Sequence, residues 1–360
     1  MTSKTDFHSL RVADIRRETA DAVSIRLDVP ESLRERFRFE PGQYLTLRAE
    51  LDGEDVRRNY SVCSAPLDDE LRIAVKLLPG GRFSSFANDR LQVGDQLDVL
   101  PAAGHFTAIF SPGQERRYAA FVAGSGITPV LSLIKTALSV EPGSSFTLFY
   151  GNRMSSQVLF LEELAALKNR FMGRLAIFHF LTMEEEEVAL FNGRLDREKC
   201  DEILTTLIDP CATDLFFACG PEGMMTAAEQ ALLARGVPED RILLERFTSA
   251  GSSPVLDEAA QARALAAAGR RMGVILDGRK LTVTFDADRG NILDSVRATG
   301  AAAPFACKGG ICATCRAKVV SGAVEMRLNY GLTREEVAAG YILTCQSMPI
   351  SDDVVVSYDS

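Results

Sequence analysis

The sequence predicts a multi-domain chain: an antiparallel β-barrel over residues 1–112, an α/β domain with a parallel sheet over 113–248, and a small α+β domain over 271–360. Three observations lead to this prediction. Short segments of alternating polarity fill the first third of the chain, continuous apolar runs separated by helical stretches follow, and four of the eight cysteines crowd into the last domain. A chain of 360 residues is also longer than one hydrophobic core normally supports.

The barrel is predicted from alternation with a period of two. Val23, Ile25 and Leu27 alternate with polar neighbours, and turn residues such as Pro41-Gly42 and Asp52-Gly53 separate the segments. Short strands at this spacing are typical of an antiparallel barrel.

The second domain is predicted from apolar runs without polar residues at alternate positions. A strand with one exposed face would show such alternation, whereas strands of a parallel sheet are buried on both faces. The predicted strands are 118–123, 146–150, 175–181, 215–219 and 242–244. The predicted helices between them are 130–138, 160–168 and 223–235. Residues 184–187, four consecutive glutamates, are expected in a solvated loop.

Residues 249–270 are expected to form a linker, with a short packed helix as the alternative. The last domain should begin with a hairpin turning at Asp277-Gly278. Asn291 is placed to cap a helix over 292–299, and Thr333 with Glu336 forms a capping-box pattern. A β-branched strand, 354–356, closes the chain.

Composition excludes several classes of function. The net charge of −9 argues against a nucleic-acid partner, because phosphate binding needs clustered Lys and Arg. The N-terminus is polar where a signal peptide has its apolar segment, and the most apolar stretch, 118–134, is interrupted by glycines and a proline. We therefore expect a cytoplasmic protein without a membrane contact.

The clustered cysteines carry the strongest signal. Cys307, Cys312 and Cys315 have the spacing C-x₄-C-x₂-C, and Cys345 follows in the same domain. This is the plant-type pattern for a [2Fe–2S] cluster, in which four thiolates hold two irons. Gly309 and Gly310 would allow unusual φ values in the loop, and Lys308 and Arg316 are placed to offset its negative charge. A zinc site is the alternative, although zinc sites more often pair two C-x₂-C knuckles.

A flavin site is predicted in the barrel domain. An arginine can pair with a phosphate, a tyrosine ring can lie on the isoalloxazine, and hydroxyls can reach the ring or ribityl chain. A later glycine turn and helix start would bind a diphosphate. The residues concerned are Arg58, Tyr60, Ser61, Ser64, Val75, Lys76, Gly81 and Ser84. The first motif alone is weak, and its weight comes from the other features around it.

A dinucleotide site is predicted at two strand ends. A glycine turn between a buried strand and a helix is suited to a pyrophosphate, although such turns also occur for packing alone. The turn comprises Gly124, Ser125, Gly126, Thr128 and Pro129. Arg153 ends the next strand with no acid beside it, which favours NADPH over NADH; a surface arginine is the alternative.

The fourth strand of this domain ends at Cys219, followed by Gly220 and Pro221, with Met224 one helix turn later. We expect Cys219 beside the nicotinamide rather than as a buried packing residue, because ligands bind at the carboxyl ends of such strands. Glu245 or Phe247 is expected to close over the flavin. Cys219, Ser61 and Glu245 are the residues predicted to act at the reacting rings.

Together these motifs resemble the ferredoxin–NADP reductase superfamily with a fused C-terminal plant-type ferredoxin of β-grasp fold. The resemblance covers essentially the whole chain, and within it the sequence is similar to reductase subunits of phenylacetyl-CoA epoxidation. The segments that carry this similarity are 7–10, 104–106, 150–153, 306–315 and 338–341. The resemblance implies FAD rather than FMN, NADPH as donor, and a di-iron phenylacetyl-CoA epoxidase of phenylacetate degradation as partner.

The predicted function is an NAD(P)H-dependent reductase that passes electrons through flavin and cluster to an oxygenase. The histidines, His8, His105 and His179, form no Glu-x-x-His di-iron motif and no Cys-x-His Rieske element, so oxygen chemistry is expected on another chain. One alternative is the reductase of a Rieske-type aromatic or steroid oxygenase, using FMN or FAD and NADH. A non-catalytic [2Fe–2S] redox sensor is the alternative of another class.

Overall fold

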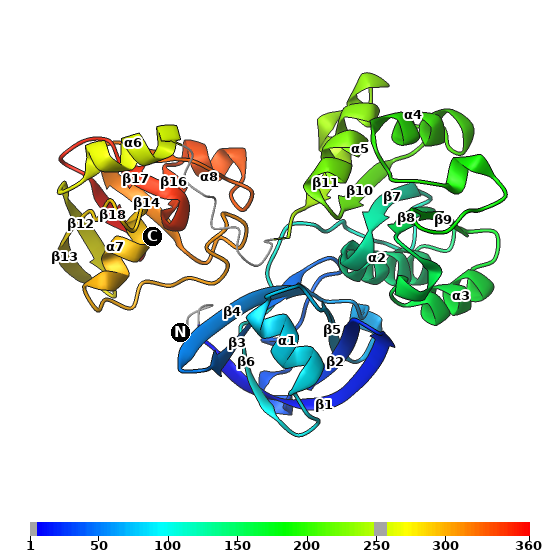
Figure 1. Cartoon of the computed structure of the whole chain (residues 1–360), viewed down its shortest axis with the longest axis horizontal. Helices are drawn as coiled ribbons and strands as arrows, with labels where there is room; N and C mark the ends of the chain where they lie inside the picture. The colour runs from blue at the N-terminus through cyan, green and yellow to red at the C-terminus, as the bar shows by residue number, and fades with distance from the viewer. Residues whose placement is uncertain (1–5, 248–257) are drawn as a thin grey trace. The chain divides into compact units, whose positions relative to one another are not determined.

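The computed structural model describes residues 6–247 and 258–360 (Figure 1). The chain divides into two compact units. The larger comprises Asp6–Val56 and Tyr60–Arg246, and it holds the barrel and the parallel sheet. The smaller comprises Arg57–Asn59 and the described residues from Phe247 onward. The three-domain boundaries predicted from the sequence stay a prediction, because this division does not test them.

The first sheet has six strands in the order β4-β3-β6-β1-β2-β5. They are β1 (His8–Thr19), β2 (Ala22–Asp28), β3 (Tyr44–Leu51), β4 (Glu54–Ser61), β5 (Leu71–Lys76) and β6 (Gln96–Val99). A bridge between Val62 and Ile73 joins the end of β4 to β5, the two edges of the sheet. The sheet therefore closes into the predicted barrel, with helix α1 (Arg82–Asp89) packed on it.

The second sheet is parallel, with the order β11-β10-β7-β8-β9. Its strands are β7 (Arg117–Ala123), β8 (Ser145–Asn152), β9 (Leu175–Leu181), β10 (Leu215–Cys219) and β11 (Ile242–Glu245). Its helices are α2 (Ile127–Val140), α3 (Leu161–Arg170), α4 (Arg197–Thr206) and α5 (Glu222–Ala234). All five predicted strands and all three predicted helices are present, whereas α4, which Asp196 caps, was not predicted.

The strand order reverses next to β7, because β8 lies on one side of it and β10 on the other. Such a switch point opens a crevice at the carboxyl ends of the strands, where ligands of these folds bind. Helices α2 and α3 cover one face of the sheet and α4 and α5 the other (Figure 1). The turns after β7 and β10 therefore meet at one edge.

One hydrophobic core cluster is shared by the barrel and the parallel sheet, beside a separate core inside the barrel and another on the α4 and α5 face of the sheet. Phe106 from the barrel side packs edge-on against Phe217 of β10, with ring centroids 5.5 Å apart. Both rings are buried, and the same cluster includes Ala22 and Cys63 of the barrel and much of α2. Burial of this shared surface fixes the two domains against each other within the larger unit.

The smaller unit has the α+β arrangement of a β-grasp. Its mixed five-stranded sheet has the order β13-β12-β18-β14-β16, and β15 pairs with β17. The strands are β12 (Arg271–Leu276), β13 (Arg279–Thr284), β14 (Arg316–Ser321), β15 (Val324–Met326), β16 (Tyr341–Leu343), β17 (Ser347–Pro349) and β18 (Val355–Ser357). The helices are α6 (Glu258–Ala267), α7 (Ile292–Ala298) and α8 (Arg334–Ala338).

Local turn and cap predictions in this unit are confirmed. Asp277 and Gly278 take φ values of 52° and 71°, as the two-residue hairpin turn requires. The Asn291 side chain accepts a hydrogen bond from the Asp294 N–H, 2.8 Å, at the start of α7. Thr333 and Glu336 form the reciprocal capping box of α8.

The segment expected as a linker is helical in its described part. Residues 249–257 lie outside the described residues, but α6 occupies most of the remainder. Ala264 and Ala267 of α6 are buried in the core of the smaller unit. The packed-helix alternative therefore describes this part of the segment.

None of the helices in residues 6–247 and 258–360 combines the length and apolarity that a membrane crossing needs.

We expect Phe106→Ala to destabilise the larger unit by about 3–5 kcal/mol, because it leaves a cavity in the shared core. Differential scanning calorimetry should show the transition of the larger unit at lower temperature and that of the smaller unit unchanged. Ile109→Ala is the matched control, since Ile109 is 82% exposed three residues away. An unchanged transition of the larger unit in Phe106→Ala would contradict the shared-core interpretation.

Candidate functional site

The predicted flavin motif lies at the end of β4 and continues into the barrel bridge. Ser61 is 3% exposed, and its Oγ has no hydrogen-bond partner among the described residues. A buried hydroxyl without a partner is costly unless a ligand completes it. The Tyr60 ring lies beside Phe83 of α1, with centroids 5.5 Å apart. These features fit a bound flavin that takes the Ser61 hydroxyl as a partner.

The side chains of Ser64 and Val75 make contacts within the barrel itself. Ser64 Oγ donates to the Glu70 carbonyl, 2.8 Å, and accepts the Arg72 N–H, 3.1 Å. Val75 is fully buried in the barrel core, and its carbonyl accepts from Asn88. We therefore interpret Ser64 and Val75 as scaffold for the site. Among the predicted cations, Lys76 lies 3.5 Å from Asp21 and Arg58 donates to the Arg57 carbonyl.

The glycine turn precedes α1 directly. The helix begins at Arg82, and Gly81 serves as its N-cap. Ser84 lies in the first turn, where its Oγ donates to the Gly81 carbonyl and accepts the Leu78 N–H. A Cβ at Gly81 would come within 2.4 Å of the Ser84 Oγ, so the turn needs glycine there.

The two turns of the predicted dinucleotide site touch through their backbones. A Cβ on Gly126 would lie 2.0 Å from the Cys219 carbonyl oxygen, and one on Gly220 would lie 3.1 Å from the Ala123 nitrogen. Gly124 has φ +54°, and its carbonyl accepts the Tyr150 hydroxyl at 3.0 Å. The structure thus brings together the predicted residues after β7 and β10. Backbone N–H groups at such a turn, leading into α2, fit a pyrophosphate.

Thr128 and Pro129 lie buried in the first turn of α2. The Thr128 hydroxyl donates to the Ser125 carbonyl, 3.0 Å, and so holds the turn in shape. Pro221 is the residue before α5, and Met224 is packed in the core at 8% exposure. Phe247, 39% exposed, ends the first described segment.

Cys219 and Glu245 are paired neighbours at the carboxyl ends of β10 and β11. Both are buried, and burial raises the pKa of the Glu245 carboxyl to about 8. Burial, with a contribution from Glu245, also raises the pKa of the Cys219 thiol well above its ordinary value. A neutral thiol beside a carboxyl that can lose its proton is suited to a nicotinamide ring, because this ring becomes positive when it gives up a hydride.

Glu184 lies at the edge of the parallel sheet where the adenosine ribose of the nucleotide is expected, after the ends of β8 and β9. The sequence did not reveal this position. Arg153 is exposed and directly follows β8. The Glu184 carboxylate accepts from the Ser155 N–H at 3.0 Å and from its hydroxyl at 3.1 Å. Glu184 is therefore not part of a purely solvated loop, and an acid does lie at this edge. The buried Asn152 Nδ2, without a partner in the described parts of the chain, was missed as well.

The four motif cysteines lie together in the smaller unit as two pairs, Cys307 with Cys312 and Cys315 with Cys345. Two pairs match a [2Fe–2S] cluster, in which each iron takes two thiolates. A hydrogen bond from the Cys312 thiol, with backbone N–H groups of Gly309, Cys312 and Ile311, lowers the pKa of Cys307 to about 6. The pKa values of Cys312 and Cys315 are instead raised, by their sulfur partners and by burial. The backbone N–H groups directed at the Cys307 sulfur are therefore the feature that prepares the loop for a thiolate.

Backbone geometry in the cluster loop differs in detail from the expectation. Gly310 has φ +79°, but the other left-handed residues are Lys308 at +52° and Ala313 at +50°, not Gly309. Gly309 instead donates its N–H to the Cys307 sulfur at 3.3 Å. Left-handed residues turn successive N–H groups inward, which creates the anion-binding concavity that a cluster needs.

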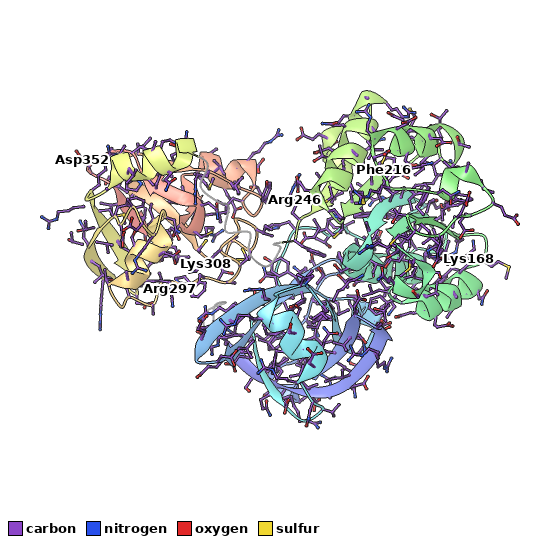
Figure 2. The ribbon with its side chains drawn as sticks, in the orientation of Figure 1. Lys168, Phe216, Arg246, Arg297, Lys308 and Asp352 are labelled. Atoms are coloured by element: carbon purple, nitrogen blue, oxygen red, sulfur yellow. The ribbon has the colours of Figure 1, made fainter. Side chains whose placement is uncertain are left out.

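The two cations of the loop are each paired with a carboxylate. Lys308 lies 2.6 Å from Asp294, and Arg316 lies 2.6 Å from Glu336, so their expected role of offsetting cluster charge is not supported. Lys308 and Arg297, labelled in Figure 2, both lie against the ring of Phe305. These cation–π contacts hold Phe305, which lies just before the first cysteine of the cluster loop, in place.

Gln346 was not predicted from the sequence, although it directly follows Cys345, a predicted ligand. It is fully buried; its Nε2 donates to the Lys308 carbonyl at 2.8 Å and lies 3.7 Å from the Cys345 sulfur. Thr344, on the other side of Cys345, donates to the Cys315 carbonyl at 2.9 Å. These bonds tie the fourth cysteine to the loop that carries the other three.

Comparison with protein-family models identifies three matches along the chain. Residues 9–108 match an oxidoreductase FAD-binding domain, residues 121–230 an oxidoreductase NAD-binding domain, and residues 274–349 a 2Fe–2S iron–sulfur cluster binding domain. The barrel, the parallel sheet and the cysteine loop therefore each have the cofactor class that their residues predicted.

Whole-chain relatives agree with this order of domains. The chain is 45% identical to one of the subunits of the 1,2-phenylacetyl-CoA epoxidase of Escherichia coli, over 99% of both chains. It is 35% identical to the ferredoxin reductase component of 3-ketosteroid-9-alpha-monooxygenase of Rhodococcus rhodochrous, covering 97% of this chain and 96% of that protein. Phthalate dioxygenase reductase shares the fold, with a TM-score of 0.59, 22% identity and 98% of each chain covered. The chain thus belongs to the family of electron-transfer reductases of multicomponent oxygenases, which join an FAD-binding and an NAD-binding domain to a 2Fe–2S ferredoxin domain.

Proposed function

We propose that this reductase takes electrons from NADPH and delivers them, through FAD and its [2Fe–2S] cluster, to a di-iron oxygenase that epoxidises phenylacetyl-CoA. The observation that carries the proposal is the 45% identity, end to end, to a component of that epoxidase. The matched region includes all three domains that the family models identify. The 35% identity to a ketosteroid monooxygenase component supports a Rieske-type or steroid oxygenase as the second candidate.

Arg153 supports NADPH, because an exposed guanidinium can pair with a 2′-phosphate. Glu184 acts in the opposite direction, since a carboxylate at this edge is the usual partner of the ribose hydroxyls of NADH. The preference for NADPH is therefore part of the proposal and is measured with it.

We assign the following roles to the chain's own residues. The turn at Gly124–Gly126 binds the pyrophosphate with backbone N–H groups, and this places the nicotinamide toward Cys219. Ser61 would hydrogen-bond a bound flavin, and Glu245, once ionised, would stabilise the positive charge that develops on a nicotinamide beside it. Bound flavin supplies the conversion between a two-electron hydride and single electrons. Cys307, Cys312, Cys315 and Cys345 hold the cluster that receives those electrons.

Turnover with defined partners tests the proposal. We expect the purified oxygenase components of phenylacetyl-CoA epoxidase to form epoxide with this chain and NADPH, at a lower KM than with NADH. A Rieske-type ketosteroid oxygenase serves as the comparison. Product only with the Rieske-type enzyme would reject the epoxidase assignment, and absence of flavin reduction by either nucleotide would favour the sensor alternative.

Cys345→Ser should remove the cluster and leave the flavin reaction intact, because Cys345 lies outside the FAD-binding and NAD-binding domains. We expect loss of acid-labile sulfide and of the visible absorption of the cluster. Reduction of ferricyanide by NADPH should persist, while electron delivery to the oxygenase should fall by about 10²-fold or more. Cys211→Ser is the matched control, since Cys211 is exposed and outside the motif. Full sulfide content in Cys345→Ser would contradict the ligand assignment.

Glu245→Gln tests the raised pKa. The folded-state pKa of about 8 exceeds the ordinary value of 4.5, so the folded chain keeps a proton that the unfolded chain loses between these pH values. The free energy of unfolding should therefore fall as pH rises through this window, by at most about 5 kcal/mol. Glu245→Gln should remove this part of the pH dependence in urea titrations of the FAD-loaded protein.

Glu222→Gln is the control for that experiment, because the Glu222 side chain is 61% exposed. The rate of flavin reduction in the native protein should rise as Glu245 ionises, and this rise should be lost in Glu245→Gln. Identical pH profiles of stability in the native protein and Glu245→Gln would show that the carboxyl is not held protonated.

A further inference from the structure

Helix α2 contacts both predicted cofactor motifs of the larger unit. Its N-terminus continues the glycine turn, where Gly126 packs directly on the Cys219 carbonyl. One to two turns further along, the side chains of Ser132 and Lys135 reach the barrel. Residues three apart lie on the same face of a helix, so both contacts come from the face turned to the flavin domain.

The first contact is a buried hydrogen bond. Ser132 Oγ donates to the Ser64 carbonyl at 2.6 Å, and both residues are fully buried. Ser64 is the last residue of the flavin motif, three positions after Ser61, and its own hydroxyl is fixed by Glu70 and Arg72. The hydrogen bond therefore joins α2 to a rigid part of the barrel, not to a loose loop.

The second contact is an ion pair shared between three elements. Lys135 Nζ lies 3.0 Å from Asp68, in the short helix after the flavin motif, and it also pairs with Glu163 of α3. The Lys135 side chain is only 13% exposed. Asp68 is held in place because it accepts the Ala65 N–H at 2.8 Å. In the sequence, Asp68 follows shortly after Ser61, the last residue of β4. The ion pair is therefore close along the chain to the flavin motif.

We propose that Ser132 and Lys135 are positioning residues for hydride transfer, which set α2, and with it the nicotinamide, at a fixed distance from the flavin. The proposal rests on the proposed function, because it takes the cofactors to bind at the motifs described above. Neither residue touches a cofactor in this arrangement. Each acts by fixing the separation of two backbone segments: the end of β4 and the turn after β7.

The physical reason is the short range of hydride transfer. The reacting atoms must approach to about 3–3.5 Å, and a misplacement of about 1 Å can cost 10²-fold in rate. The nonpolar contacts of the shared core hold the domains together, but the hydrophobic effect that drives them is not directional. A directed, buried hydrogen bond and an ion pair whose lysine is largely covered define one register of α2 along the barrel.

Ser132→Ala removes the hydroxyl that donates to the Ser64 carbonyl, which then stays buried without a hydrogen bond from α2. We expect the rate constant of flavin reduction at saturating NADPH, measured anaerobically by stopped flow, to fall about tenfold to a hundredfold. FAD content and the affinity for NADP⁺ should stay at native values, because no binding residue is changed. With 4-deuterated NADPH the variant should still show a full primary isotope effect, which shows that hydride transfer itself has slowed.

Thr136→Ala is the matched control. Thr136 is a buried hydroxyl one turn further along α2, but its bond stays within the helix, to the Ser132 carbonyl at 2.8 Å. It should reduce its flavin at the native rate. Equal slowing in Thr136→Ala and Ser132→Ala would show general damage to α2 and would overturn the proposal.

Lys135→Met and Lys135→Arg give a second, independent test. The methionine variant keeps the length of the side chain without its charge and should slow flavin reduction, while the arginine variant should restore most of the rate. Native rates in Ser132→Ala and Lys135→Met would reject the positioning role and leave the proposed function intact. If the native protein itself takes no hydride from NADPH or NADH, the proposed function fails first.

Discussion

Close approach of backbone to backbone at the carboxyl edge of the parallel sheet is the constraint on which the nucleotide site depends. Gly126 and Gly220 leave no room for a Cβ between the turns after β7 and β10. This contact places Cys219 beside the start of α2, and the register of β10 with β11 then brings Glu245 to Cys219. One packing requirement thus positions the turn proposed to bind pyrophosphate, a thiol and a carboxyl.

Backbone geometry is also decisive in the cluster loop, where it acts through hydrogen bonds to sulfur. The cysteines predicted as ligands must be held as thiolates while largely removed from water, and removal from water alone would keep them protonated. Backbone N–H groups of Gly309 and Cys312 directed at the Cys307 sulfur offset that cost. Gln346 and Thr344 add side-chain hydrogen bonds around the distant fourth ligand. The loop is prepared by its backbone more than by its charged side chains.

How much of this could be predicted from the sequence depends on the range of the contacts. The hairpin at Asp277-Gly278 and the cap at Asn291 were predicted because a few adjacent residues determine them. Predicted cofactor classes agree with the family models, since motif spacing is also local. The contact of Glu184 with Ser155 joins residues 29 positions apart on different strand ends, and no local pattern reveals it. The left-handed residues in the cluster loop were misassigned because glycine is permitted, not required, at such positions.

The division into two compact units follows the physical difference between the two kinds of transfer. The nucleotide turns and the flavin motif from Tyr60 onward belong to the larger unit, where a shared core and the contacts of α2 keep them in register. Hydride transfer requires that register, because bond formation tolerates little error in distance. The four cysteines belong to the smaller unit, which has a core of its own. Electron tunnelling requires proximity but no bond, so a cluster in a separate unit can receive electrons without a shared hydrophobic core.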